Sequence, residues 1–155
     1  MKSCVIVVLL QFIALSLPAQ VTNDTTGVMR ALASILQTEL QPPITVQLDT
    51  ATCNWSAPSC STGAMSGVSQ HPLVDALVVA LGDKGRRWES GVADCRAYGR
   101  GPFDIVVRPP VFDSGGARIL VSMNCLRLAY SRGEEFAFRF DGAWHLTARR
   151  LVWVT

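Results

Sequence analysis

The sequence has few residues of the kinds that catalyse reactions or bind nucleic acids. Its 155 residues include only two histidines, charged residues make up 17%, and the formal net charge is +2. Basic residues cluster only at Lys84-Gly85-Arg86-Arg87. So small a charge, without a larger basic patch, gives no electrostatic basis for binding a phosphate backbone. We therefore expect no nucleic-acid partner.

Motifs of enzymes and cofactor sites are also missing. Ser66 has Ala64 where the nucleophile elbow of a hydrolase has glycine. The run Gly99-Arg100-Gly101 lacks the rest of a dinucleotide-binding fingerprint, and the sequence contains no phosphate-binding loop. No cysteines or histidines have the close spacing of a zinc site. The sequence therefore predicts no catalytic residue, no cofactor and no metal site.

The first residues predict export. Met1-Lys2-Ser3 is a basic start, residues 4–17 are almost entirely apolar, and Ala19 is a small residue before Gln20. This order is typical of a secretory signal peptide, and the apolar run is short for a membrane span. We expect a signal peptide over residues 1–19 and one secreted or periplasmic domain over residues 20–155, with no membrane span after cleavage. The alternative is an uncleaved N-terminal anchor.

The cysteines agree with an oxidising compartment. Once Cys4 leaves with the signal peptide, four cysteines remain, namely Cys53, Cys60, Cys95 and Cys125. An even number in an exported chain favours two disulfides and no free thiol, and four cysteines allow three pairings. We favour a bond between Cys53 and Cys60, which would close a short ring of mostly small residues. Cys95 is then left to bond Cys125.

Apolar periodicity predicts two helices separated by a strand. The first helical stripe ends before Pro42-Pro43 and consists of Val28, Leu32, Ile35, Leu36 and Leu40. The second helix begins at Pro72, where His71 is in a capping or solvent-exposed position, and ends at Gly82. Its apolar surface is wide, so we expect cover on more than one side. Residues 44–49 alternate like a half-exposed strand.

The C-terminal third predicts strands. Residues 82–102 are interpreted as a loop, residues 103–107 as a strand, and residues 117–130 as a strand that bends or bulges. Asp141-Gly142 then lies between two alternating runs, which is typical of a β-hairpin. A three-residue loop would place Phe136, Phe138, Trp144 and Leu146 on one face, whereas a two-residue loop would divide them. Burial favours the three-residue loop.

This element order predicts an α+β fold. We expect a curved antiparallel sheet of about four to five strands, with a C-terminal hairpin and both helices packed on one face. The closing pattern aromatic-x-aromatic-Asp-Gly-x-Trp, from Phe138 to Trp144, resembles that of small exported bacterial proteins of unknown function. The shape resembles nuclear-transport-factor-like and cystatin-like domains. This resemblance implies a cone-like fold and transfers no site residue.

Three classes of function remain open. A non-catalytic module that binds a small molecule or an envelope protein is favoured, and a structural or interaction protein that uses an edge strand is the alternative. An enzyme is the third, and it would need His145 and Asp104 to converge in a cavity. We expect His145 and Trp144 at a rim, and Asp104 capping a turn.

Overall fold

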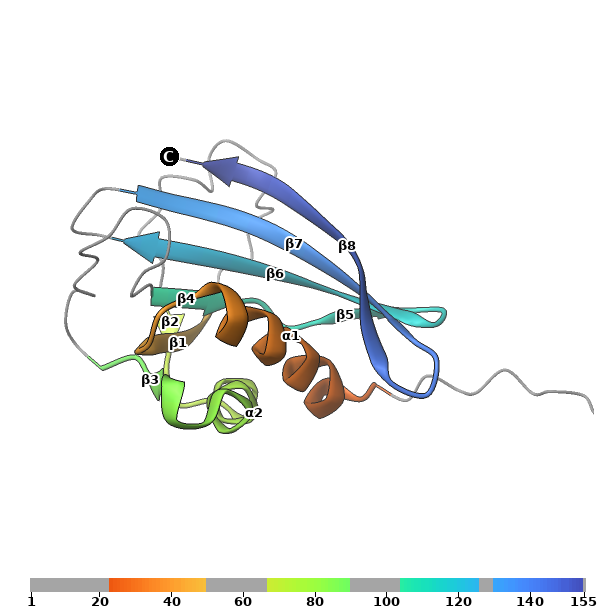
Figure 1. Cartoon of the computed structure of the whole chain (residues 1–155), viewed down its shortest axis with the longest axis horizontal. Coiled ribbons are helices and arrows are strands. Elements are labelled where there is room, and N and C mark those ends of the chain that lie inside the picture. Colours follow the sequence, from red (N-terminus) through yellow and green to blue (C-terminus); the bar gives the residue numbers. More distant parts are fainter. Residues whose placement is uncertain (1–22, 50–66, 90–103, 126–129, 155) are drawn as a thin grey trace, which may run out of the picture.

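The computed structural model describes residues 23–49, 67–89, 104–125 and 130–154. In this part of the chain, two α-helices lie on one face of a curved sheet of eight strands (Figure 1). The last two strands form a C-terminal hairpin of eleven residues on each side. The predicted α+β class, with both helices on one face and a C-terminal hairpin, is confirmed.

Helix α1, Thr25–Glu39, begins where the sequence provides capping side chains. Asp24 is the N-cap, and its Oδ1 accepts a hydrogen bond of 2.8 Å from the backbone N–H of Gly27. This bond satisfies one of the amides that a helix start leaves without a partner. The buried residues of the helix follow one face, and they are Val28, Met29, Leu32, Ala33 and Leu36.

Helix α2, Pro72–Leu81, has the predicted start and end. The Nδ1 of His71 accepts a hydrogen bond of 3.1 Å from the backbone N–H of Leu73, so His71 is a capping residue. Gly82 follows the helix with a φ of 59°, a conformation that side chains disfavour. The helix contacts α1 as well as strands of the sheet, but Val79 is 80% exposed on the side opposite its buried residues.

The strands have the bounds β1 Ile44–Asp49, β2 Gly67–Val68, β3 Gly85–Arg87, β4 Asp104–Val107, β5 Val111–Asp113, β6 Gly116–Cys125, β7 Tyr130–Phe140 and β8 Trp144–Val154. Their order across the sheet is β2-β1-β4-β6-β7-β8, with β3 beside β1 and β5 beside β6. Strand β1 runs parallel to β3 and β4, and all other pairs are antiparallel.

The expectation of a fully antiparallel sheet of four to five strands is therefore wrong in detail. The chain returns to β1 after α2, and such a crossover brings the next strand alongside in the parallel direction. Strands β2, β3 and β5 have only two or three residues, too few for any alternation to be visible. The predicted loop over residues 82–102 contains β3.

The long run over residues 117–130 also divides differently. Strand β6 ends at Cys125, and Tyr130, the first residue of β7, pairs with it. The chain therefore reverses direction within the run instead of bending inside one strand. The sequence stays apolar through Leu126, Leu128 and Tyr130, so it gives no sign of where the chain turns.

The inner face of the sheet, which packs on the two helices, carries the core. Its buried residues come from β1, β4, β6 and β7, and they are Ile44, Val46, Leu48, Ile105, Val107, Ala117, Ile119, Val121, Met123, Phe136 and Phe138. The outer face is buried as well over most of β1, over β4 and over the C-terminal end of β6. Gln47 and Asp49 are therefore buried, and the prediction that this strand is half-exposed is wrong.

The hairpin has the predicted three-residue loop, Asp141-Gly142-Ala143. Phe138 lies opposite Leu146, Phe140 lies opposite Trp144, and Gly142 has a φ of 98°. Phe136 and Phe138 are buried, and Trp144 packs partly buried against the core. Leu146 lies on the same face but is exposed. The predicted register is confirmed, because Trp144 and Leu146 lie on the same face of the hairpin as the two phenylalanines.

We predict that the free energy of unfolding depends on the face to which a hairpin residue points. Phe138→Ala should lower it by about 3–5 kcal/mol through lost burial and a cavity. His145→Ala, on the exposed face, should change it by about 0.5 kcal/mol or less. Gly142→Ala should give an intermediate loss because of its positive φ. Urea denaturation measures all three, and a severe His145→Ala beside a mild Phe138→Ala would contradict the register.

Candidate functional site

Strand β8 forms an exposed edge of the sheet. Within the described residues it pairs with β7 alone (Figure 1), and residues 145–151 are all exposed. An edge strand presents backbone N–H and C=O groups that can pair with another extended chain. This strand is the most accessible long element of the described fold.

The exposed edge carries an apolar strip on its inner side. Leu146, Leu151 and Val154 are 41%, 57% and 51% exposed. They lie opposite Phe138, Glu134 and Arg132 respectively, so all three lie on the inner face of the sheet. The same face packs on α1 at strands further from the edge. We call these three residues the β8 strip. The strip exists because the inner face extends beyond the area that the helices cover.

Two register shifts divide the edge into segments. One shift lies between Gly133 and Glu134 and the other between Ala137 and Phe138, so Val152 and Thr147 are the extra residues of β8. Bulges of this kind twist an edge and interrupt its ladder. Between them, residues 148–151 pair regularly with β7. This segment is the regularly paired part of the edge, and Leu151 of the β8 strip lies at its end.

Adjacent arginines at the centre of β8 point to opposite faces. On the inner face, the Nε of Arg149 donates to Oε2 of Glu134 at 2.6 Å, and Nη1 donates to Oε1 of Glu39 at the end of α1. The guanidinium carbon lies 4.9 Å from the centre of the Phe136 ring, within the range of a cation–π contact. Arg149 therefore joins β8 to both β7 and α1.

The positive charge on Arg149 is stabilised by its carboxylate partners. Burial disfavours the charged guanidinium, but hydrogen bonds and attraction from Glu39 and Glu134 outweigh that effect and raise the pKa of Arg149. Glu134 is nearly buried and also lies 3.4 Å from the Nε of Arg132. The two ion pairs of Glu134 are better protected from solvent than an ordinary surface pair, because the Glu134 side chain is only 8% exposed.

Arg150 is the contrasting case on the outer face. Its side chain is 71% exposed, and its Nη2 lies 3.2 Å from Oε1 of Glu135 on the opposite strand. Adjacent glutamates on β7 and adjacent arginines on β8 thus pair across the hairpin, one pair on each face. An exposed pair contributes about 0–1 kcal/mol, so Arg150 can exchange its partner at little cost.

A polar row crosses the buried part of the outer face. Asp104, predicted to cap a turn, is instead buried on β4, where Oδ1 accepts a hydrogen bond from the Thr45 hydroxyl. Asp49 accepts a 3.0 Å hydrogen bond from the Nε of Arg108, and this ion pair is also buried on the Asp49 side. These bonds satisfy polar groups that a buried sheet face would otherwise leave without partners.

The structure does not bring His145 and Asp104 together. His145 is exposed at the hairpin end, 2.8 Å from Oδ1 of Asp141. His145 pairs with Arg139 of β7, which in turn pairs with Gly116 of β6. Asp104 pairs with Asn124, which is also on β6. Eight positions along a strand correspond to roughly 26 Å. An acid–base pair of these two residues is therefore ruled out.

Trp144 joins the hairpin to the start of α1. Its Nε1 donates a 3.1 Å hydrogen bond to Oδ2 of Asp24, the residue whose other oxygen caps the helix. Its ring also contacts Phe112 and Phe140, with centroids 6.0 Å and 5.3 Å away. Trp144 thus holds the hairpin end against α1. No sequence pattern indicated this contact, because the two residues are 120 positions apart.

The cysteine predictions fall outside the described residues. Cys53, Cys60 and Cys95 lie in ranges that the structure does not describe, and for Cys125 only the backbone at the end of β6 is described. Both disulfides stay predictions. No group of three or more potential metal ligands occurs within the described ranges. No helix there is long and apolar enough to cross a membrane.

Comparison with family models, curated proteins and solved structures finds no match to this chain. The resemblance to nuclear-transport-factor-like and cystatin-like domains stays a prediction. The candidate site was only partly visible in the sequence. The pairing of the arginines could be expected, but the apolar run from Leu151 to Val154 did not reveal which of its residues the helices leave uncovered.

We predict that the two arginines differ in their effect on stability. Arg149→Gln should lower the free energy of unfolding by about 2 kcal/mol, because it leaves the nearly buried Glu134 with Arg132 as its remaining cation; this is below the cost of breaking a fully buried pair. Arg150→Gln, the matched control, should cost about 0.5 kcal/mol or less. Equal losses in urea denaturation would show that the inner network does not hold α1 to the hairpin.

Proposed function

We propose that this protein is an exported, non-catalytic module that binds another protein through β8. The observation that carries the proposal is an eleven-residue edge strand that keeps three large apolar side chains in solvent. A partner segment would add a strand beside β8, with backbone hydrogen bonds giving affinity and alternate side chains giving specificity. Its inward side chains would cover the β8 strip.

The charge of β8 favours one kind of partner. The strand, with sequence WHLTARRLVWV, contains two arginines and no carboxylate. Two copies of β8 placed edge to edge would bring like charges together, which disfavours a dimer through this edge. An extended segment that alternates apolar and acidic residues fits best. Its acidic side chains would lie near Arg150, and its apolar side chains near Leu151.

Export of this module is supported by the N-terminal sequence pattern alone. Cleavage after Ala19 would leave five residues before α1, which begins at Thr25. The domain could therefore fold without the signal peptide. Mass spectrometry of the secreted protein should give a chain that starts at Gln20, and a secreted chain that retains residues 1–19 would contradict the cleavage.

Designed peptides test the binding mode. We expect an alternating valine–glutamate octapeptide to bind and to shift the backbone amide resonances of residues 145–154 in nuclear magnetic resonance spectra. An alternating valine–lysine peptide should bind roughly five- to tenfold more weakly, because one attraction is replaced by one repulsion. The control for composition is a peptide with the same valines and glutamates arranged in two blocks. As a strand, this peptide cannot place all its valines on one face and all its glutamates on the other.

Variants of the protein distinguish this binding mode from non-specific binding. R150E should reverse the preference toward the valine–lysine peptide, whereas R30E, which alters an exposed arginine on α1, should leave it unchanged. L151S should weaken both peptides without reversing the preference. The proposal is wrong if the peptides shift resonances elsewhere, or if R30E and R150E have equal effects.

A further inference from the structure

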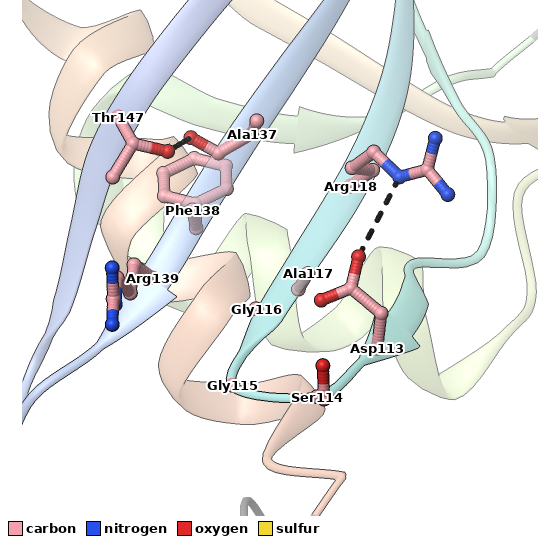
Figure 2. Close-up of a pocket in the computed structure, with 10 residues that line it drawn as sticks. All are labelled: Asp113, Ser114, Gly115, Gly116, Ala117, Arg118, Ala137, Phe138, Arg139 and Thr147. Carbon is pink, nitrogen blue, oxygen red and sulfur yellow. Dashed lines mark hydrogen bonds and ion pairs between the residues drawn. The ribbon is translucent and has the colours of Figure 1, made fainter.

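A shallow groove lies on the outer face where β5, β6, β7 and β8 come together near their turns (Figure 2). It encloses about 340 Å³, which is within the lower range of small-molecule sites. Its walls include Asp113 and Ser114 of the β5–β6 turn, Arg118 of β6, Arg139 of β7 and Thr147 of β8. This groove is separate from the β8 strip, which belongs to the inner side.

The floor of the groove is made of small residues. Gly116 pairs with Arg139, and Ala137 pairs with Arg118, so a glycine and an alanine lie between the two arginines. A Cβ on Gly116 would come within 2.9 Å of both Oδ1 of Asp113 and the backbone oxygen of Phe138. A side chain therefore does not fit there. This restriction keeps the space between the arginines open.

Both arginines are exposed and available. Figure 2 shows them on opposite sides of Gly116 and Ala117. The Nε of Arg118 lies 3.9 Å from Oδ2 of Asp113, a distant pair between half-exposed side chains. Such a pair contributes little. No hydrogen bond or ion pair joins the side chain of Arg139 to any other residue in the described ranges.

We propose that this groove binds a small molecule through an anionic oxygen group, a carboxylate or a phosphate. A guanidinium presents its N–H groups as a planar fork that matches either group. Two arginines against one aspartate leave a net charge of +1 at the groove (2 − 1). The hydroxyl of Ser114 supplies a further donor, and Asp113 competes with the ligand for Arg118.

Titration with citrate and with inorganic phosphate tests the site and separates the two chemistries. We expect saturable shifts of the amide resonances of residues 113–118 and of the Arg139 side chain, in roughly the millimolar range. Saturation by citrate alone identifies a carboxylate, by phosphate alone a phosphate group, and by both a general oxyanion site. The absence of saturation with either anion overturns the proposal.

Charge-neutral variants decide whether the groove itself binds. R118Q and R139Q should each weaken binding about fivefold or more, whereas R30Q, with the same loss of charge on α1, should have little effect. D113N should strengthen binding, because it removes the competitor for Arg118. Equal weakening by R30Q and R139Q would show that the anion responds only to net charge, and binding unchanged in R139Q would exclude the groove.

Discussion

The register of the C-terminal hairpin is the constraint on which the rest of the described structure depends. The loop Asp141-Gly142-Ala143 sets Phe138 opposite Leu146. This pairing decides which side chains of β8 point to the inner face and which point to the outer face. Phe136 and Phe138 enter the core, Arg149 reaches Glu39 of α1, and Trp144 reaches the cap of the same helix. A slip of β8 by one residue would turn Arg149 and Trp144 to the outer face and break both contacts with α1 together.

The alternation of side chains along β7 and β8 produces the two surfaces to which we assign binding. Because the inner face of β8 extends beyond α1, the β8 strip stays in solvent, although Phe138 on the next strand is buried. Because Arg139 alternates with Phe138, it emerges on the outer face beside Gly116 and close to Arg118. One surface is apolar and fits an extended peptide, and the other is cationic and fits an anion. The two proposals rest on different residues and can fail separately.

The sequence was most informative where apolar periodicity and turn residues agreed. The helices from Thr25 and Pro72, the strand from Ile44 and the hairpin loop follow from spacing, proline and glycine. The strands β2, β3 and β5 were missed, since two or three residues cannot show alternation. The burial of Asp49 and Asp104 was also missed, because polar residues on a strand normally indicate a solvent face. Contacts such as Trp144 with Asp24 depend on the completed fold and have no local pattern.

The most direct test of this account is the cross-strand pairing of the hairpin, measured by nuclear Overhauser contacts between protons of β7 and β8. The register described here predicts contacts of Phe138 with Leu146 and of Phe136 with Arg149. Contacts of Phe138 with His145 and of Phe136 with Thr147 would indicate a two-residue loop. In that case the Arg149 network and the β8 strip would both be misassigned.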